Sequence, residues 1–418
     1  MREASYSLQS LVGPPRLRDD RDDIFNPGHA AMTGHAKANI RILFALTLVH
    51  FTGDFYSSFT NPLFPLFVEK MGLSLTQIGV IAGVNRFLAF IIQPMAGYYS
   101  DRYQTRLFIM VGLLLPVVFI PISGIAVGFW TLLAAVALGS VGSSMFHPSV
   151  TGMVPLYAGR NAGFSMSIFN TGGTLAFGVG PLFITWYAAR YGLSALPATM
   201  VFGLAALVYL YFTVPSPESE GMRHLGFIGA VRESLGGAWK SIILIWAVMF
   251  LRALVGQSFM TFMPVLYVQK GFSIVSAGMI FSLFTIAGTA GGLLAGHISD
   301  RIGFKPVFLF THAVMAPILF LFLKLEGGWV YLGAILAGAA VLASLPIGVV
   351  MAQTLAPKGR SMVASLMMGF AFGLGGMLSP LVGKLADLTS IQSVLTGITV
   401  IPLVTLPIIA CFPSAGSR

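Results

Sequence analysis

Apolar residues in this chain are gathered into long runs that short polar stretches separate. From residue 39 onward each run has about 20 residues or more, the length an α-helix needs to cross the hydrocarbon core of a bilayer. The predicted spanning helices lie near residues 39–68, 76–100, 106–126, 130–156, 161–189, 194–214, 240–269, 274–299, 305–325, 329–355, 361–388 and 391–412. The pattern therefore predicts an all-α polytopic membrane protein with twelve transmembrane helices.

The one long polar connection divides these helices into two sets of six. The predicted organisation is a disordered cytoplasmic tail, an N-terminal half, a cytoplasmic linker, a C-terminal half and a second cytoplasmic tail, at 1–38, 39–214, 215–239, 240–412 and 413–418. The first tail carries a mixed-charge run and lacks the apolar segment of a signal peptide. Met32 lies just before the first apolar run, so one hypothesis is that translation starts there.

An internal repeat relates the two sets of helices. Gly97-Tyr98-Tyr99-Ser100-Asp101-Arg102 matches Gly296-His297-Ile298-Ser299-Asp300-Arg301 at an offset of 199 residues. The same offset pairs Pro65 with Pro264, Gly72 with Gly271, Gly79 with Gly278, and Pro181-Leu182 with Pro380-Leu381. One register over more than a hundred residues indicates two pseudo-symmetric halves, with a substrate site near the membrane midplane between them.

Composition and charge agree with this class. The chain is 56% hydrophobic and 9% charged, whereas a soluble globular protein needs about 25% charged residues. Of its 24 Lys and Arg residues, 17 fall on one predicted side of the membrane and 5 on the other. The positive-inside rule then predicts that both termini are cytoplasmic. No basic stripe with interleaved aromatic residues is present, so nucleic acid is not an expected partner.

Motifs of common enzymes are missing from the sequence. It has no Walker lysine, no Ser/His/Asp triad and no Cys/His zinc spacing, and its single cysteine, Cys411, can form no intrachain disulfide. We expect a protein that is not an enzyme and that needs no cofactor.

Asp54 is the one carboxylate near the middle of a predicted spanning helix. A charged side chain costs at least about 2.5–3.5 kcal/mol at such a depth, so an intramembrane acid indicates a functional site. On the same helix His50, Asp54, Ser57, Ser58 and Asn61 recur at i, i+4, i+7, i+8 and i+11, which places them on one face. The alternative is that Asp54 forms a permanent structural pair with an arginine.

Three further polar residues are expected to face the same water-filled space. They are His147 on the fourth helix, Arg252 on the seventh and Arg86 on the second. Two guanidinium groups against one acid favour an anionic or zwitterionic small molecule, since their forked donors suit carboxylate, phosphate or phosphonate. The alternatives are that Arg86 snorkels or pairs with a helix carbonyl, and that His50 and His147 are core histidines bonded to backbone carbonyls.

The repeated element resembles the loop signature of the major facilitator superfamily, and the resemblance covers about residues 39–412. The matching residues are Gly97, Asp101, Arg102 and Arg106, and in the second half Gly296, Asp300, Arg301 and Lys305. Glycine permits close helix approach there, and the Asp can sit at the positive end of the next helix. The resemblance implies a transporter that needs only one chain and exchanges small molecules across the bilayer.

Other segments are similar to the fosmidomycin-resistance branch of that superfamily. They are Gly142 to Pro148, Ser167 to Gly173, Gly369 to Gly376, and His50-x-x-x-Asp54. The branch implies export of a drug or anionic metabolite in exchange for protons, from the inner membrane of a bacterium. Two positions depart from it: Ser149 stands where an acidic residue is expected, and Arg86 where no arginine is expected.

The expected site residues fall into three sets. Asp54, His50 and His147 are assigned to proton coupling. Arg86, Arg252, Tyr56, Asn170 and Gln257 are assigned to substrate binding. Gly172, Gly173, Gly180 and Pro181 resemble the antiporter motif, whose small residues suit helices that slide past each other.

Three rival functions remain open. The same residues suit proton symport, which would make the protein an importer of organic anions. His50, Asp54 and His147 also offer ligands for a metal ion, as in a transporter of metals or metal chelates, although the nearby arginines count against it. The third is a receptor or assembly factor built on this fold that moves no solute.

Overall fold

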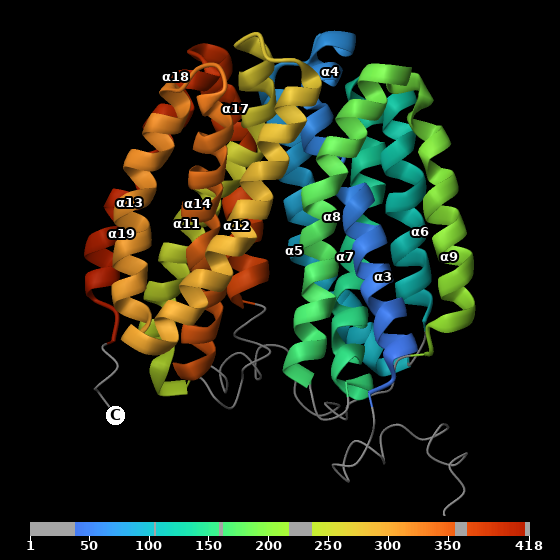
Figure 1. The fold of residues 1–418 in the computed structure, drawn as a ribbon, viewed down its shortest axis with the longest axis horizontal. Coiled ribbons are helices and arrows are strands. Elements are labelled where there is room, and N and C mark those ends of the chain that lie inside the picture. The colour runs from blue at the N-terminus through green and yellow to red at the C-terminus, as the bar shows by residue number, and fades with distance from the viewer. Residues whose placement is uncertain (1–37, 104–105, 159–161, 217–235, 356–365, 414–418) are drawn as a thin grey trace, which may run out of the picture.

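The computed structural model describes residues 38–103, 106–158, 162–216, 236–355 and 366–413, and it is all-helical (Figure 1). The N-terminal half contains α3 (Ile40–Ser57), α4 (Thr60–Met71), α5 (Leu75–Tyr103), α6 (Leu107–Ile122), α7 (Phe129–Tyr157), α8 (Ala162–Tyr191) and α9 (Met200–Thr213). The C-terminal half contains α11 (Trp239–Gln269), α12 (Ile274–Ile302), α13 (Phe304–Lys324), α14 (Trp329–Leu355), α16 (Ala371–Met377), α17 (Ser379–Leu388), α18 (Ile391–Ile398) and α19 (Ile401–Ala410).

These helices form twelve consecutive transmembrane segments, because α3 and α4, α16 and α17, and α18 and α19 each make up one. Within the described residues, eleven segments meet the length and hydropathy needed to cross a membrane. The prediction of twelve spanning helices is confirmed, with ends that shift by a few residues. The predicted first tail, most of the linker 215–239 and most of the last tail lie outside the described residues, so these domain boundaries stay predictions.

Proline explains why three segments are each divided into two helices. Pro62, Pro380 and Pro402 follow the breaks by a few residues. A proline has no N–H to donate to the carbonyl four residues earlier, so the helical ladder is interrupted there. In the first segment the break comes after Ser57, one turn beyond Asp54, and it fixes the depth at which α3 ends.

The molecule has two distinct ends. The end with the turns at Gly72, Gly192, Gly271 and Gly327 is called the turn end here, and the opposite end, where α3 begins and α19 ends, is called the terminal end. The repeat partners Gly72 and Gly271 have φ angles of 63° and 89°. Only glycine adopts this left-handed region without strain, so each half closes its first long segment in the same way.

Among the described residues, two main seams join the halves, with further contact of α4 with α11 and α12, and all of these lie toward the turn end (Figure 1). In the first seam α5 packs against α16 and α17, where Gly79 lies on the backbone of Ser379, and Gly383 on that of Leu75. In the second seam α8 packs against α12, with Gly278 against Thr185 and the Thr285 hydroxyl donating to the Phe177 carbonyl at 3.1 Å. The two sets of ribbons diverge toward the terminal end.

The buried core follows the same division. One large cluster of apolar side chains runs through both halves at the turn end, including Phe64 and Phe67 of α4 with Phe259 and Phe262 of α11. A second cluster, which includes Ile245 and Phe308, belongs to the C-terminal half alone. Within the described residues, the core that the two halves share therefore lies toward the turn end.

The repeated signature differs from the predicted loop. Gly97, Asp101 and Arg102 lie within α5, which continues to Tyr103, and Gly296, Asp300 and Arg301 lie within α12. A loop position for these residues was therefore wrong, because both helices extend about one turn further than the apolar runs indicate. The side chains of Gly97, Asp101 and Arg102 lie outside the described ones.

Arg106 and Lys305, which follow the two copies, have matching partners. The Arg106 guanidinium donates to the carbonyls of Tyr211 and Val214 at the end of α9, at 2.8 and 3.3 Å. Lys305 Nζ donates to the carbonyls of Ala410 and Phe412 at the end of α19, at 2.7 and 3.1 Å. Each cation thus caps the last helix of its own half, where carbonyls lack intrahelical partners and the helix dipole is negative.

Candidate functional site

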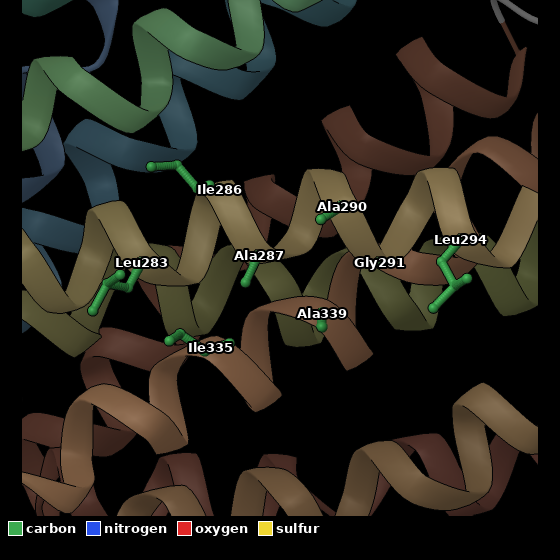
Figure 2. A pocket seen from close by; sticks show the side chains of 8 residues that line it. All are labelled: Leu283, Ile286, Ala287, Ala290, Gly291, Leu294, Ile335 and Ala339. Atoms are coloured by element: carbon green, nitrogen blue, oxygen red, sulfur yellow. The ribbon is translucent and has the colours of Figure 1, made fainter.

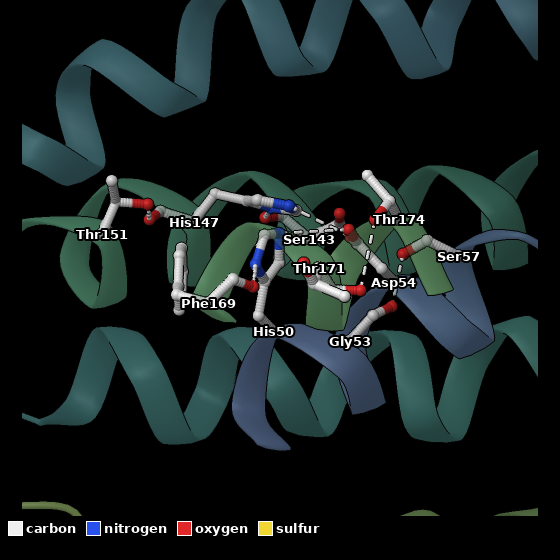
Figure 3. Close-up of polar contacts among 10 residues, drawn as sticks. All are labelled: His50, Gly53, Asp54, Ser57, Ser143, His147, Thr151, Phe169, Thr171 and Thr174. Carbon is white, nitrogen blue, oxygen red and sulfur yellow. Dashed lines mark hydrogen bonds and ion pairs between the residues drawn. The ribbon is translucent and has the colours of Figure 1, made fainter. Parts of the chain in front are cut away.

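Three titratable side chains meet inside the N-terminal half, and they are called the acid trio here: His50, Asp54 and His147 (Figure 3). His50 and Asp54 lie one turn apart on α3, and His147 reaches them from α7. His50 Nε2 lies 3.2 Å from Asp54 Oδ2, and His147 Nε2 lies 3.0 Å from Asp54 Oδ1. Each oxygen of the carboxylate therefore faces one imidazole.

Backbone carbonyls fix the orientation of both imidazole rings. His50 Nδ1 lies 2.9 Å from the Phe169 carbonyl on α8, and His147 Nδ1 lies 2.6 Å from the Ser143 carbonyl on its own helix. A carbonyl oxygen only accepts, so the hydrogen-bond network assigns a proton to each Nδ1. Each Nε2 is then left to face the carboxylate.

This network has a consequence for the charge of the acid trio. A neutral imidazole protonated at Nδ1 has a lone pair at Nε2, and that lone pair would point at a carboxylate lone pair. The two contacts are attractive only when a proton or a metal cation lies between the nitrogen and the oxygen. The geometry is therefore that of a cation-holding site, and within the described residues it is the one group of His, Cys, Asp and Glu side chains arranged to hold a metal ion.

Aromatic rings and a glycine enclose the acid trio. His50 stacks on Phe169 with ring centroids 4.3 Å apart, and His147 stacks on Phe146 at 4.2 Å. Gly173 of α8 lies so close that a Cβ atom there would come within 2.7 Å of Asp54 Oδ2. The Asp54 side chain is 7% exposed and that of His147 is 27% exposed, so His147 is the most open member of the trio.

The antiporter-like glycines serve this enclosure. A Cβ at Gly172 would lie 3.0 Å from the Thr47 carbonyl, and one at Gly180 would lie 3.0 Å from the Phe55 carbonyl. Gly172, Gly173 and Gly180 thus let α8 pack directly on α3, and Pro181 is buried on α8 just after them. Close approach of these two helices brings the Phe169 carbonyl to His50.

The two intramembrane arginines occupy different surroundings. Arg86 on α5 is half-buried, packs over Gly376 of α16, and lies near enough for its charge to act on Asp54. Within the described part of the chain its guanidinium has no hydrogen-bond partner. Arg86 therefore presents unused donors between the two halves, which does not fit the alternative that it pairs with a helix carbonyl.

Arg252 does not face the acid trio, contrary to the expectation of one shared space. It is 1% exposed within the C-terminal half, donates to the Val341 carbonyl at 3.0 Å, and its guanidinium lies 4.7 Å from the centre of the Phe372 ring. Its Nε and Nη2 atoms have no partner among the described residues. In this conformation α14 and α16 cover the group, although its unpaired donors keep it a candidate for an anion.

Tyr56 was assigned to substrate binding, and its position gives it a structural role instead. Its side chain is 1% exposed, its hydroxyl donates to the Thr199 carbonyl, and the same oxygen accepts from Gly203 N at 2.9 Å. It therefore holds α3 to the start of α9. Asn170 is exposed on α8, whereas Gln257 is buried on α11, and neither forms a hydrogen bond to another described residue.

A separate apolar groove lies on the C-terminal half between α12 and α14 (Figure 2). It has a volume of about 430 Å³. The residues that line it are Leu283, Ile286, Ala287, Ala290, Gly291, Leu294, Ile335 and Ala339. None of the predicted site residues lines it, so it adds nothing to the polar chemistry of the acid trio.

Backbone carbonyls are the partners that the sequence offered as an alternative for His50 and His147, but the sequence did not predict which carbonyls orient the acid trio. The acceptors are the carbonyls of Ser143 and Phe169, and any residue type supplies a carbonyl. The spacing of His50 and Asp54 carried a signal. No feature of the sequence indicated which carbonyls orient the rings, because this depends on how closely α8 packs on α3.

Comparison with known proteins adds an independent observation. A family profile described as Major Facilitator Superfamily matches residues 46–380. The fosmidomycin resistance protein of Escherichia coli (strain K12) is 28% identical over 382 residues, which cover 90% of this chain and 94% of that protein.

Solved structures share the architecture. A bacterial homologue of the human lysosomal transporter Spinster, in an inward-facing and occupied conformation, has a TM-score of 0.73 at 15% identity, covering 90% of this chain and 96% of its own. The nucleoside transporter NupG has a TM-score of 0.72 at 14% identity, covering 89% and 98%. At these identities the likeness concerns the fold alone.

Proposed function

The chain belongs to the Major Facilitator Superfamily, and from that premise we propose that it is a proton-coupled exporter of a small anionic or zwitterionic drug or metabolite. Membership makes it a multi-pass membrane transporter and not an enzyme. The exporter direction, the proton coupling and the substrate class are the proposed steps. The relation to a protein named for fosmidomycin resistance supports a phosphonate as the first substrate to try.

The observation that carries the proposal is the acid trio. Its two contacts, at 3.0 and 3.2 Å, are attractive only with a cation in each, and protons are the cations that imidazole and carboxylate exchange. An ionisable cluster inside a spanning segment is costly, and such clusters occur where protons or ions cross. We assign proton binding to Asp54, with His50 and His147 as its partners.

Substrate binding is assigned to Arg86 and, after a conformational change, to Arg252. Arg86 has unused donors between the halves and lies within electrostatic reach of Asp54. An anion bound at Arg86 would cancel part of its charge, and this would alter the cost of a charge on Asp54. Such mutual influence is the requirement for exchanging an anion against protons.

The orientation proposed here follows the Lys and Arg distribution, 17 against 5. It places both termini in the cytoplasm of a bacterium and the turn end outside. Because the seams lie toward the turn end, the structure then corresponds to the state that is closed to the outside. The two halves, 39–214 and 240–412, are proposed to rock against each other within a single chain.

The test is export of fosmidomycin and of other anionic antibiotics from a drug-sensitive bacterium that produces the protein. We expect wild type to raise the growth-inhibiting concentration at least about fourfold and Asp54→Asn to abolish this protection, because the amide cannot exchange a proton at neutral pH. Ser57→Ala is the matched control, since the Ser57 hydroxyl on the same helix donates to the Gly53 carbonyl and bonds to no other described residue. Full protection by Asp54→Asn would contradict the proposal.

Two alternatives use the same residues and are separated by further measurements. An importer would accumulate organic anions in vesicles when the outside is acidic, whereas an exporter would release them from loaded vesicles under that gradient. A metal transporter is supported by the ligand geometry of the acid trio. It would move Zn²⁺ or Ni²⁺ in vesicles, and the proposed exporter would move neither.

A further inference from the structure

The first turn of α5 is capped from two directions. Ser74 and Gln77 form a reciprocal pair in which Gln77 Oε1 accepts from Ser74 N at 3.0 Å and Ser74 Oγ accepts from Gln77 N at 3.2 Å. This local capping box leaves two amides of the turn, Leu75 N and Thr76 N, without an intrahelical acceptor.

A carboxylate from the other half supplies the missing acceptors. Asp387 near the end of α17 accepts from Leu75 N through Oδ1 and from Thr76 N through Oδ2, both at 2.8 Å. It also accepts from the Thr76 hydroxyl. A carboxylate bonded to two amides at a helix N-terminus combines charge-assisted hydrogen bonds with the positive end of the helix dipole.

The repeat has no equivalent on the other seam. The offset of 199 residues maps Leu75 and Thr76 onto Ile274 and Val275 at the start of α12, and it maps Asp387 onto Ala188 of α8. The Ala188 methyl group cannot accept a hydrogen bond. Ser273 retains the local cap of α12 by accepting from Ser276 N at 3.1 Å. The carboxylate cap from Asp387 is therefore present at the seam between α5 and α17 and has no counterpart at the seam between α8 and α12.

We propose that Asp387 is a latch that holds the two halves together at the turn end and sets how often that end opens. The proposal rests on the proposed function only in assuming that the halves separate there. Separation leaves Leu75 N and Thr76 N to water and removes an anion from the end of α5. Loss of the carboxylate is expected to raise the fraction of molecules that are open at the turn end roughly tenfold.

The experiment measures the separation of the halves directly. In a Cys411→Ser background, spin labels at Val127→Cys and Trp329→Cys report the distance across the turn end, where these side chains are 87% and 68% exposed. Double electron–electron resonance in lipid nanodiscs should give mainly a short distance for the parent. The population with a longer distance between the labels should be larger in Asp387→Asn and larger again in Asp387→Ala.

Two further variants make the result specific. Thr76→Val removes only the hydroxyl donor and should have a smaller effect than Asp387→Ala. Gln77→Ala weakens the local capping box without touching the contact between halves, so its distances should match the parent. Unchanged distances in both Asp387 variants, or an equal change in Gln77→Ala, would overturn the latch. The readout requires no substrate or proton gradient, so it is independent of whether the proposed function holds.

Discussion

At the scale of single residues, the acid trio depends on a carboxylate held between two fixed imidazoles. Phe169 and Ser143 orient the rings through their carbonyls, and Gly173 leaves room for Asp54. Apart from the stacking of the Phe169 ring on His50, these three residues contribute no side-chain chemistry to the trio. Their contribution is geometric, so small changes in volume should affect transport more than they affect folding.

Gly173→Ala tests this geometric contribution. The added methyl would lie within 2.7 Å of Asp54 Oδ2 and would also contact His50. We expect transport to fall at least about tenfold, since a displacement of an ångström in a functional group has effects of that order. Thermal unfolding in detergent should show a loss of only about 1–3 kcal/mol.

The matched control for this change is Gly152→Ala on α7. A Cβ at Gly152 meets no atom within 4 Å, and alanine favours a helix over glycine by up to about 1 kcal/mol. Its transport should equal that of wild type. Equal losses of transport in the two variants would show a general sensitivity to replacing a helix glycine and would contradict a specific role for the space beside Asp54.

At the scale of helices, the two halves repeat both their lengths and their caps. Arg106 and Lys305 hold the ends of α9 and α19 through equivalent carbonyls, 199 residues apart. The signature that seemed to mark a loop therefore ends in a cation that stabilises the last helix of its half. This role is structural and needs no motion.

Arg106→Gln and Lys305→Gln should each lower the free energy of unfolding by about 1 kcal/mol, because each removes a cation from helix carbonyls. Thermal unfolding of the purified protein in one detergent provides the measurement. Arg41→Gln is the control, since Arg41 is exposed at the start of α3, away from any helix C-terminus, and donates to no carbonyl among the described residues. If the control variant were destabilised as much as the other two, the role of Arg106 and Lys305 as helix caps would be contradicted.

Hydropathy was sufficient to predict the helices and insufficient to predict where their side chains point. Segment lengths and the repeat follow from apolar runs, because every spanning helix must satisfy its backbone internally. The burial of Arg252 could not be predicted in the same way. Its helix, α11, is apolar on nearly all sides, so no amphipathic face indicates whether residue 252 lies toward the other half or toward α14. The breaks at Ser58, Leu378 and Thr399 could not be predicted either, because each lies inside one apolar run.

At the scale of the whole molecule, the contacts between the halves that the described residues make lie toward the turn end, and the two main seams differ in chemistry. The seam between α5 and α17 combines backbone contacts at Gly79 and Gly383 with the charged cap from Asp387. The seam between α8 and α12 has small residues and one hydroxyl bond, from Thr285. Opening the turn end therefore requires more free energy at the seam between α5 and α17 than at the seam between α8 and α12.

Gly79→Ala should oppose closure of the first seam. The new methyl would lie within 2.9 Å of Pro380 Cα and against the Ser379 carbonyl, neither of which can move without moving α17. Overpacking should destabilise the closed state by roughly 1–3 kcal/mol and leave the open state unaffected. This corresponds to an increase of about fivefold to hundredfold in the ratio of open to closed molecules. The distribution of distances between spin labels at residues 127 and 329 would measure this shift toward the open state. Gly152→Ala, with no atom within 4 Å of its Cβ and far from both labels in the chain, should leave that distance unchanged.

The acid trio also has a consequence for membrane voltage. With a proton in each of its two contacts, one carboxylate and two imidazolium groups sum to a charge of +1, and release of one proton brings the sum to zero. Each elementary charge carried across the membrane is worth about 2.3 kcal/mol per 100 mV. The exchange of a monoanion for one proton would then transfer net charge, so the resting potential of the cell, and not acidity alone, would drive the cycle.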